Sequence, residues 1–375
     1  MYDDHLPESP AEAAAVHVPG HSILQTHQLS DPVQSLVPLG RDEVGARTAD
    51  SAVVLLRRGD QRPGRRTALG GPARQGRSLA LAMGGRVLVA CLENGPLTLF
   101  DAETGERLRN LRPHPGVATC IAVSWDGRKA ATGGSDRCLR LWDLEGGECL
   151  QSLQGHDAFI TSLSWLPGTT NVVTGSADGT LRLWNLDRGQ CERVMDGQRG
   201  PVRAVDSSGD GTIAAAGCQD GSIAIWDLQA GEVLRRLRGP GGAVTTVALV
   251  DDSVVAGSED GTVRIWNMEN GSASRVVRFP GPVQDLVPAG GSQLWVAHGS
   301  AVSSVFASGM RAVRLPLVLS ESVASFDLAD RERDFRNHLR TARELMASGR
   351  MSDAIEELRE ARGVQGYDHH SDALA

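Results

Sequence analysis

Apolar and polar side chains alternate in the stretch Leu181-Arg182-Leu183-Trp184-Asn185-Leu186, as they do in a β-strand that packs on both faces. Close copies of this stretch occur at residues 139–144, 223–228 and 263–268, so that successive tryptophans lie 42, 42 and 40 residues apart. A period of about 40–45 residues is typical of the blades of a β-propeller. The repeat therefore predicts an all-β fold built from similar sheets.

The unit around Trp184 contains four predicted strands. Residues 160–165 and 171–176 alternate as the first two strands, and residues 181–186 form the third. Asp178-Gly179 predicts a tight hairpin turn between the second and third strands, because this pair readily adopts positive φ angles. Residues 191–195 complete the unit as a fourth strand, and four strands make one propeller blade.

Weaker copies extend this series in both directions. Residues 32–38 and 282–288 are nearly identical to each other, and both read as the first strand of a unit. We therefore expect a seven-bladed β-propeller over residues 27–320. Six blades are the alternative if residues 27–70 adopt another structure. The expected third-strand anchors are Leu56, Phe100, Trp142, Trp184, Trp226, Trp266 and Phe306.

The two ends of the chain differ from the repeats. Residues 1–26 contain four acidic residues, no Lys or Arg and several prolines, which predicts a mobile acidic segment. After about residue 327 the apolar period changes from 2 to 3.6, which predicts a short α-helical tail over residues 331–375. Residues 342–361, which turn at Gly349-Arg350, resemble a tetratricopeptide-type helical hairpin.

A propeller must also close its ring, because an unpaired sheet edge between the first and last blades invites aggregation. Two segments are candidates for the outer strand of the last blade. Residues 16–18 would supply it from the N-terminal end, and residues 311–315 would supply it from the C-terminal end. The spacing of residues 311–315 from Phe306 matches the fourth strands of other units, which favours the second candidate.

The composition excludes several classes of protein. The chain has 375 residues, 41% of them hydrophobic, and a formal net charge of −8, which argues against a general nucleic-acid binder. Its six cysteines form no CxxC pair and no zinc-type cluster, so we expect no metal and no cofactor. The start of the chain lacks the features of a signal peptide, and no run of about 18 apolar residues occurs. These features favour a cytoplasmic protein that does not enter membranes.

The repeating unit resembles the WD40 repeat family in residues that stand at fixed offsets: Gly155-His156, Asp178 and Trp184-Asn185. The resemblance covers roughly residues 27–320. It implies a protein-binding propeller, usually without catalysis. It also implies an internal hydrogen-bond network, which only two units retain, because Gln198 and Pro240 replace the histidine in the next two. The implied network residues are His114, Asp136 and Trp142 in one unit, and His156, Thr174 or Ser176, Asp178 and Trp184 in the other.

In this family, partners often contact the face that bears the loops entering the first strands and the turns between the second and third strands. Phe159 is the strongest candidate on that face, because an apolar aromatic residue at the rim has no evident role in the core. The implied partner-binding residues are Gln34, Phe159, Thr161, Arg203, Gln219, Thr245, Glu259 and Gln284.

Signals of catalysis are weak. The hydroxyl, histidine and aspartate near His156 superficially match a nucleophilic triad, but the same residue types recur at the repeat period, which one active site does not explain. Residues 206–211 resemble a calcium loop without its closing glutamate, and we interpret them as a polar turn. We therefore assign no catalytic residues.

One arginine-rich stretch, residues 57–77, stands out from the repeats, and Asp60 is its only acidic residue. It is interpreted first as a solvated loop. The alternative is a patch for an acidic protein, a phosphopeptide or RNA, or for the chain's own acidic residues 1–12. The stretch contains Arg57, Arg58, Arg62, Arg65, Arg66, Arg74 and Arg77, of which Arg62, Arg65 and Arg66 are the candidate contacts.

The sequence leaves three hypotheses for the function. A non-catalytic scaffold or regulatory module that binds proteins or peptides is favoured. Binding of nucleic acid or another acidic ligand through residues 57–77 is the second hypothesis. An enzyme with its site in the central pore is the third, and Asp285 is the main carboxylate expected there. The sequence leaves the partner, the pathway and the oligomeric state open.

Overall fold

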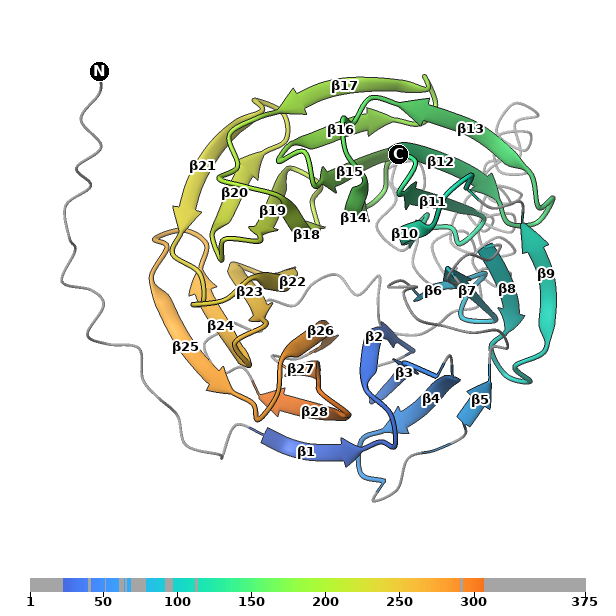
Figure 1. Ribbon diagram of the computed structural model, residues 1–375, viewed down its shortest axis with the longest axis vertical. Helices are drawn as coiled ribbons and strands as arrows, with labels where there is room; N and C mark the ends of the chain where they lie inside the picture. The colour runs from blue at the N-terminus through green and yellow to red at the C-terminus, as the bar shows by residue number, and fades with distance from the viewer. Residues whose placement is uncertain are drawn as a thin grey trace, which may run out of the picture. The chain divides into compact units, whose positions relative to one another are not determined.

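The computed structural model describes residues 23–39, 42–50, 52–60, 64, 66–68, 79–91, 97–111, 114–290 and 293–306. Within these ranges, 28 β-strands form seven four-stranded sheets, which are arranged as blades around a central axis (Figure 1). The prediction of an all-β, seven-bladed propeller is therefore confirmed. No helix in the same ranges has the length and hydropathy needed to cross a membrane.

Each blade runs from an inner first strand beside the axis to an outer fourth strand. Blade 1 contains β2 (Val33–Pro38), β3 (Glu43–Thr48), β4 (Ala52–Arg57) and β5 (Arg66–Ala68), and blade 2 contains β6 (Leu79–Ala82), β7 (Val87–Cys91), β8 (Leu97–Asp101) and β9 (Arg107–Leu111). Blade 3 contains β10 (Ala118–Val123), β11 (Lys129–Gly134), β12 (Cys138–Asp143) and β13 (Cys149–Gln154), and blade 4 contains β14 (Ile160–Trp165), β15 (Asn171–Ser176), β16 (Leu181–Asn185) and β17 (Gln190–Met195). Blade 5 contains β18 (Val202–Ser207), β19 (Ile213–Cys218), β20 (Ile223–Asp227) and β21 (Glu232–Leu237), and blade 6 contains β22 (Val244–Val250), β23 (Ser253–Ser258), β24 (Thr262–Asn267) and β25 (Ala273–Arg278). Blade 7 contains β26 (Val283–Gly290), β27 (Gln293–His298), β28 (Ala301–Phe306) and β1 (Ile23–Gln28).

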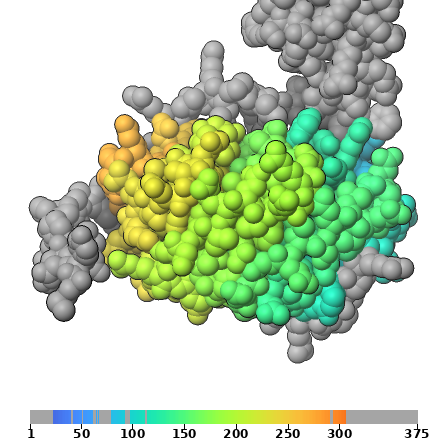
Figure 2. Space-filling view, turned by 90° about the horizontal axis from the view of Figure 1, so that it is seen from above, coloured from blue at the N-terminus to red at the C-terminus, as the bar shows by residue number. Residues whose placement is uncertain are grey.

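Burial falls from the middle strands of a blade to its outer strand. In blade 4, β15 is buried from Val172 to Ser176, whereas β17 exposes Glu192, Arg193 and Val194. In the space-filling view, the residues of the green and yellow blades pack directly against one another (Figure 2). The core of the protein therefore lies within and between the blades.

Six of the seven predicted anchors occupy equivalent positions. Trp184 pairs with Val172, the second residue of β15, and its side chain is only 2% exposed. The same pairing with the second residue of the second strand, and a similar degree of burial, are found at Leu56, Phe100, Trp142, Trp226 and Trp266.

The prediction of Phe306 as the seventh anchor is wrong by one residue. Val305 pairs with Leu294, the second residue of β27, and Val305 is 2% exposed. The cause is a shorter turn, because only Gly299 and Ser300 connect β27 to β28, whereas residues 135–137 connect the same strands in blade 3. A period of 40 residues counted from Trp266 therefore ends at Phe306, one residue after the buried position.

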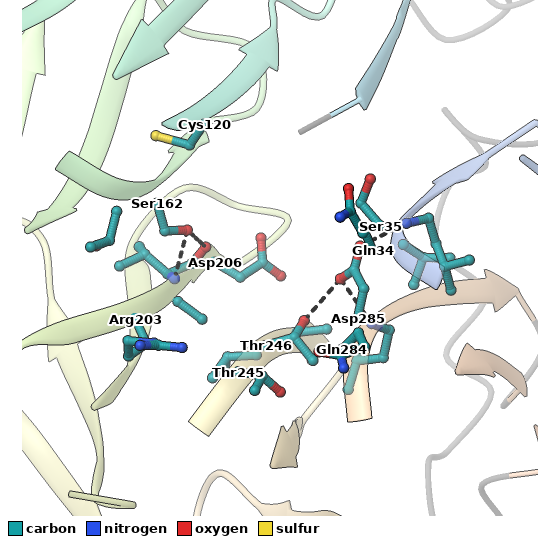
Figure 3. Close-up of a pocket in the computed structure, with 18 of the residues that line it drawn as sticks. Gln34, Ser35, Cys120, Ser162, Arg203, Asp206, Thr245, Thr246, Gln284 and Asp285 are labelled. Atoms are coloured by element: carbon teal, nitrogen blue, oxygen red, sulfur yellow. Dashed lines mark hydrogen bonds between the residues drawn. The ribbon is translucent and has the colours of Figure 1, made fainter. Parts of the chain in front are cut away.

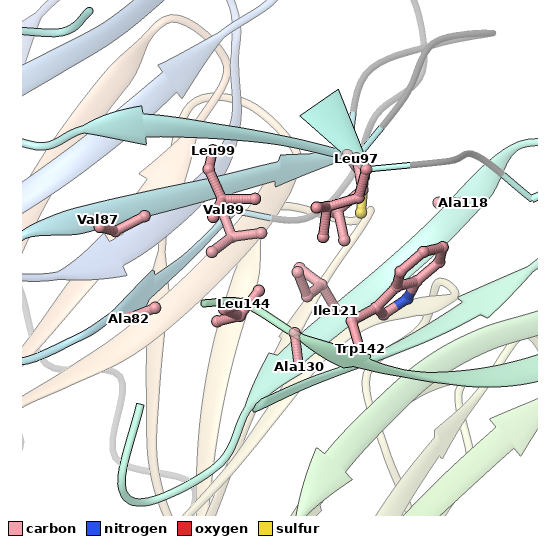
Figure 4. Close-up of a cluster of buried hydrophobic side chains, with 12 residues drawn as sticks. Ala82, Val87, Val89, Leu97, Leu99, Ala118, Ile121, Ala130, Trp142 and Leu144 are labelled. Carbon is pink, nitrogen blue, oxygen red and sulfur yellow. The ribbon is translucent and has the colours of Figure 1, made fainter. Parts of the chain in front are cut away.

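Apolar packing joins each blade to the next. The described residues form seven buried hydrophobic clusters, one at each boundary between neighbouring blades. At the boundary of blades 2 and 3, Trp142 shares a cluster with Leu97 and Leu99 of β8 and with Ile121 of β10 (Figure 4). Since burial of apolar surface is the main favourable term in folding, these boundaries supply much of the stability of the ring.

A recurring glycine of the second strand permits this close packing. A Cβ atom at Gly217 would lie 2.3 Å from Cγ1 of Val244 in the next blade, and one at Gly257 would lie 2.4 Å from Cγ1 of Val283. Both distances are far below van der Waals contact. These positions therefore need glycine for its missing side chain, and neither has a positive φ angle.

Hydrogen bonds also join neighbouring blades at the outer strands. The guanidinium of Arg193 in β17 donates to the carbonyl oxygen of Ala230, in the turn between β20 and β21, at 3.0 Å. Equivalent outer-strand side chains, spaced 42 residues apart along the chain, also donate to a backbone carbonyl oxygen in this turn of the following blade. These bonds join Arg109 to Glu145, Gln151 to Leu186 and Arg235 to Glu269. This series was not predicted from the sequence, although its spacing equals the repeat period.

The ring closes through a segment that neither prediction named. β1 (Ile23–Gln28) is the outer strand of blade 7 and pairs antiparallel with β28, so that Thr26 lies opposite Ser303. The prediction that residues 311–315 take this place is therefore wrong. The alternative named the correct end of the chain, but it placed the strand at residues 16–18 and not at Ile23–Gln28. Both of these segments lie outside the described residues. The predicted mobile segment 1–26 is also too long, because its last four residues belong to β1.

β1 contacts blade 1 as well as blade 7. The side-chain oxygen of Gln25 accepts a hydrogen bond from the backbone N–H of Gly59 at 2.8 Å, and its amide donates to the carbonyl oxygen of Asp60. Leu29, which follows β1 directly, belongs to the hydrophobic cluster between blades 7 and 1. We call the boundary between these two blades the closing boundary, and β1 contacts both of its sides.

The predicted helical tail, residues 331–375, lies outside the described residues. The helical hairpin therefore stays a prediction.

Candidate functional site

The first strands of all seven blades line a central channel that contains a cavity of about 670 Å³ (Figure 3). Polar side chains from several blades face it. Six of the predicted partner-binding residues are among its lining residues: Gln34, Thr161, Arg203, Thr245, Glu259 and Gln284. Phe159 and Gln219 are not among them.

One end of the channel, which we call the Phe159 face, carries all of these predicted residues. The backbone N–H of Ala177 donates to the carbonyl oxygen of Phe159 at 3.0 Å, and this bond joins the turn after β15 to the loop before β14. The N–H groups of Gln219 and Glu259 make the equivalent bonds in blades 5 and 6. Equivalent backbone geometry therefore puts Phe159, Gln219 and Glu259 on the same face.

Two of the predicted contact residues are already used between blades. The Thr161 hydroxyl lies 2.9 Å from the carbonyl oxygen of Gly175 in its own blade and 2.8 Å from that of Val202 in the next. Thr245 has the same relation to its own and the next blade. A hydroxyl has one proton to donate, so each side chain is already satisfied within the fold. Thr161 and Thr245 are therefore poorer candidates for partner contact than Phe159.

Arg203 and Glu259 form an ion pair at the rim of the channel. The guanidinium of Arg203 in blade 5 lies 3.3 Å from the carboxylate of Glu259 in blade 6. The two side chains are 23% and 52% exposed, so solvent screens the attraction and the pair adds little to stability. Both groups remain accessible to a partner at the face.

Two half-buried carboxyl groups lie on the channel wall, in the first strands of blades 5 and 7, which flank blade 6 on either side (Figure 3). Asp285 of β26 accepts a hydrogen bond from the backbone N–H of Leu36 in blade 1 at 2.8 Å. Asp206 of β18 accepts one from the backbone N–H of Leu249 in blade 6 at 2.9 Å. An inner strand has no strand partner on its channel side, so its N–H groups need such acceptors. Burial raises the pKa of Asp206 and raises that of Asp285 to about 6.

Asp206 is a channel residue that the sequence analysis missed. The interpretation of residues 206–211 as a turn is wrong for Asp206 and Ser207, which belong to β18. A signal was present, because Asp206 lies 42 residues after Ser164, which belongs to the first strand of the preceding unit. Among the described residues, no group of three or more His, Cys, Asp or Glu side chains is placed to hold a metal ion.

The hydrogen-bond network of blade 4 runs in one direction. The indole N–H of Trp184 donates to the hydroxyl of Thr174 at 2.8 Å, and this hydroxyl donates to Nε2 of His156 at 2.8 Å. Nδ1 of His156 then donates to the Asp178 carboxylate, also at 2.8 Å. Burial lowers the pKa of His156, so the ring is neutral at pH 7, with one donor and one acceptor nitrogen. Ser176 stands outside the network, and its hydroxyl donates to the carbonyl oxygen of Phe159 at 3.0 Å.

Blade 3 contains the same arrangement. Trp142 donates to Thr132 at 2.8 Å, Thr132 lies 2.7 Å from Nε2 of His114, and Nδ1 of His114 lies 2.9 Å from the Asp136 carboxylate. Thr132 and Thr174 are both fully buried. A hydroxyl without access to solvent cannot reach a substrate, so neither Thr132 nor Thr174 fits the position of the nucleophile in a triad.

The tryptophans of blades 4 and 5 allow this hydrogen bond to be measured apart from packing. Trp184 and Trp226 are 2% and 1% exposed, but the indole nitrogen of Trp226 has no hydrogen-bond partner. We expect Trp184→Phe to lower the free energy of unfolding by about 1–2 kcal/mol more than Trp226→Phe, because only the first change removes a bond. Urea denaturation of both variants measures the difference. Equal losses would show that the bond adds nothing to stability.

The buried histidines contribute to the change of stability with pH. Burial lowers the pKa of His114 and of His156, whereas an unfolded histidine titrates near its model value of 6.5. As the pH falls below 6.5 the unfolded chain takes up protons first, so the free energy of unfolding decreases, and above that pH these groups have no effect. We expect wild type to lose more stability than His156→Gln between about pH 7.5 and 5.5, measured by urea denaturation. Equal losses in the two proteins contradict this.

The described arginines of the arginine-rich stretch pair with the chain's own acids. Arg57 lies 3.3 Å from Glu43, and Arg58 lies 2.8 Å from Asp42. Arg66 forms ion pairs with Asp31 and Asp50. The structure does not describe the other arginines of the stretch or residues 1–12; these arginines are Arg62, Arg65, Arg74 and Arg77. Intramolecular pairing of this kind reduces the charge that is left for an acidic ligand.

Comparison with protein families identifies the repeating unit. Four segments match the model described as WD domain, G-beta repeat, at residues 105–143, 147–185, 189–227 and 231–267. These segments are WD40 repeats. The comparison with curated proteins found no match.

Each WD40 repeat spans two blades. The repeat at residues 147–185 contains β13, the outer strand of blade 3, followed by β14, β15 and β16 of blade 4. Continued to the start of the propeller, the same phase groups β1 with β2, β3 and β4. The unit then begins with the outer strand of the preceding blade, which for blade 1 is blade 7. The phase of the WD40 repeat therefore accounts for ring closure by β1.

Proposed function

We propose that this propeller is a non-catalytic scaffold that binds proteins or peptides on the Phe159 face. One observation carries the proposal: Phe159 is 48% exposed, yet its backbone is held in place. Its carbonyl oxygen accepts hydrogen bonds from the Ser176 hydroxyl and from the Ala177 N–H, each at 3.0 Å. An exposed aromatic ring on a fixed backbone loses little entropy on binding, which suits it as a binding hot spot.

The surroundings of Phe159 fit this role. The ion pair of Arg203 and Glu259 supplies exposed charges of both signs on the same face. Polar and charged groups around an apolar anchor are the usual arrangement of a binding interface. WD40 propellers typically act as scaffolds without catalysis, and the two His–Asp sets of this chain are used inside the blades.

Affinity capture tests the scaffold role. The full chain, Phe159→Ala and Leu150→Ala would each be used to capture proteins from a cell lysate, followed by identification by mass spectrometry. Leu150 is a matched control, because it is 46% exposed but lies on the outer strand β13. We expect Phe159→Ala to lose a defined set of proteins that Leu150→Ala retains. Identical sets for all three proteins would refute the proposal.

The predicted tail is tested by the same method. A chain that ends at residue 327 keeps every described strand but lacks residues 331–375. If the tail recruits partners of its own, this chain loses a set of proteins different from the set lost by Phe159→Ala. If it captures everything that the full chain captures, the propeller alone is the scaffold.

A further inference from the structure

Trp125 lies in the turn between β10 and β11 of blade 3, and its side chain faces solvent. At 66% it is the most exposed large apolar residue in the part of the chain that the structure describes. Neighbouring strands of a blade are antiparallel, so the turns after first and third strands lie at the end opposite to the Phe159 face. We call this opposite end the Trp125 face.

The turn itself does not need the tryptophan side chain. Residues 208–212 of blade 5 form the same turn, in which Gly209 takes the place of Trp125. In both turns a serine hydroxyl donates to the aspartate two residues later, and a glycine N–H donates to the serine carbonyl oxygen, at 2.8 Å for Gly127 and 2.9 Å for Gly211. A large aromatic ring that the turn does not require, held on a fixed backbone, suits a binding anchor.

The turns around Trp125 form one continuous surface. Backbone hydrogen bonds join four of them, at residues 83–86, 102–106, 124–128 and 144–148. The N–H of Ala102 donates to the carbonyl oxygen of Arg86 at 2.8 Å, that of Met83 to Gly127 at 3.2 Å and that of Leu144 to Arg128 at 2.9 Å. Two turns of blade 2 and two of blade 3 are therefore fixed beside one another.

This surface is acidic. The four turns contain five acidic residues and two arginines, and four of the acids are exposed glutamates: Glu103, Glu106, Glu145 and Glu148. The turns at the same end of blades 4 to 6 continue the pattern. In blades 2 to 6 together, the turns after first and third strands contain ten acidic residues, three arginines and no lysine. The Trp125 face therefore surrounds an exposed aromatic ring with negative charge.

We propose that the Trp125 face binds an arginine-rich segment of a partner protein, with one guanidinium stacked on the indole ring of Trp125. This goes beyond the proposed function, because it assigns a second binding surface to the other end of the ring. A guanidinium is planar and weakly hydrated and stacks on aromatic faces, of which tryptophan is the best. The acidic turns attract the remaining arginines of the segment and speed their association.

Other occupants fit this face less well. Nucleic acids and anionic lipid surfaces have the same sign of charge as the acidic turns, and would be repelled. A second copy of this chain would bring two acidic faces together in a symmetric contact, which is also unfavourable. A cationic peptide combines the two features that the surface offers, which are an aromatic ring and negative charge.

Isothermal titration calorimetry with the full chain tests this surface, with acetyl-hexaarginine amide as the probe. Acetyl-hexacitrulline amide is the matched neutral peptide, and we expect it not to bind. Trp125→Ala should weaken binding of the arginine peptide about fivefold. It should leave the unfolding midpoint unchanged, because the same turn forms with Gly209 in blade 5. Phe159→Ala removes an exposed aromatic residue from the opposite face, and should bind the peptide like wild type.

The contribution of the acidic turns is tested by a double substitution. Glu145→Gln combined with Glu148→Gln should weaken binding and reduce its dependence on salt. Asp157→Asn combined with Glu259→Gln changes the net charge equally on the Phe159 face, and should leave binding unchanged. If the two pairs weaken binding equally, the attraction is that of the whole chain, and the assigned surface is refuted.

Tryptophan fluorescence gives a direct readout of the ring. All seven tryptophans lie within the described residues, and Trp125 alone is more than half exposed. Binding of hexaarginine should therefore change the emission of wild type and leave that of Trp125→Ala unchanged. Equal affinity of wild type and Trp125→Ala for the peptide would refute the proposal.

Sedimentation velocity distinguishes the remaining occupant. If wild type forms dimers and Trp125→Ala is monomeric, a second copy covers this face and the proposal is wrong. We expect both proteins to sediment as the same species. The scaffold role of the Phe159 face is decided separately, since the capture experiment with Phe159→Ala leaves Trp125 and its turns unchanged.

Discussion

Removal of residues 1–28 is expected to abolish the cooperative thermal unfolding of the propeller. This deletion takes away β1, so β28 becomes an unpaired edge strand at the closing boundary. It also removes the bonds of Gln25 to blade 1 and the bond of 2.8 Å between Thr26 and Ser303. A strand that contacts both blades contributes several kcal/mol, and total stabilities are only about 5–15 kcal/mol.

A chain that lacks only residues 1–22 is the matched control. It keeps Ile23–Gln28 and therefore every described contact of β1. We expect its unfolding midpoint to equal that of the full chain, measured by circular dichroism and by calorimetry. If the chain without residues 1–28 unfolds at the same midpoint as this control, β1 is not needed to close the ring.

Gly217→Ala is expected to destabilise the propeller strongly, because the added methyl group overlaps the neighbouring blade. The new Cβ would lie 2.3 Å from Cγ1 of Val244 and 2.8 Å from Cγ2 of Val247, both in blade 6. Blades 5 and 6 would have to separate to relieve this overlap. Overpacking of this kind costs about 1–3 kcal/mol, and we expect the upper part of that range because both β-branched neighbours are buried.

Gly209→Ala is the control, because a Cβ there has no atom within 4 Å and the residue has no positive φ angle. Its effect on the free energy of unfolding should stay within about 0.5 kcal/mol. In a double-mutant cycle, Val244→Ala should recover part of the loss caused by Gly217→Ala, because it removes the overlapping methyl groups. Independent, additive effects of the two changes would show that close packing between these blades is not the cause.

Local features of the blades could be predicted from the sequence, whereas features of the ring could not. Trp184, its turn at Asp178 and the partner His156 lie within one short segment, and their spacing repeats. The position of β1 depends on contacts across the whole chain, and no local pattern near Ile23 marks it as part of blade 7. The predicted unit also began at a first strand, although the WD40 repeat begins at the outer strand of the preceding blade. That choice of phase placed the closing strand after Phe306.

The candidate site was also predicted only in part, because local repeat positions could be read from the sequence and contacts between blades could not. The rim residues Gln34, Arg203 and Gln284 follow from positions in a repeat, and they do line the cavity. Asp206 was missed because its neighbours Gly209 and Gly211 favoured a turn that in fact begins after Ser207. The hydrogen bond from the Leu36 N–H to Asp285 joins the first and last blades, and no local pattern of the sequence shows it.

Ring closure by β1 has a consequence for the segments that flank the propeller. Ile23 lies opposite Val305 in the ladder of β1 and β28, and neighbouring strands are about 5 Å apart. Residues 1–22 and the residues after Phe306 are thus tethered to the ring at adjacent points. Such tethering raises the effective concentration of each flank for the other, and for any ligand held by one of them, to about the millimolar range.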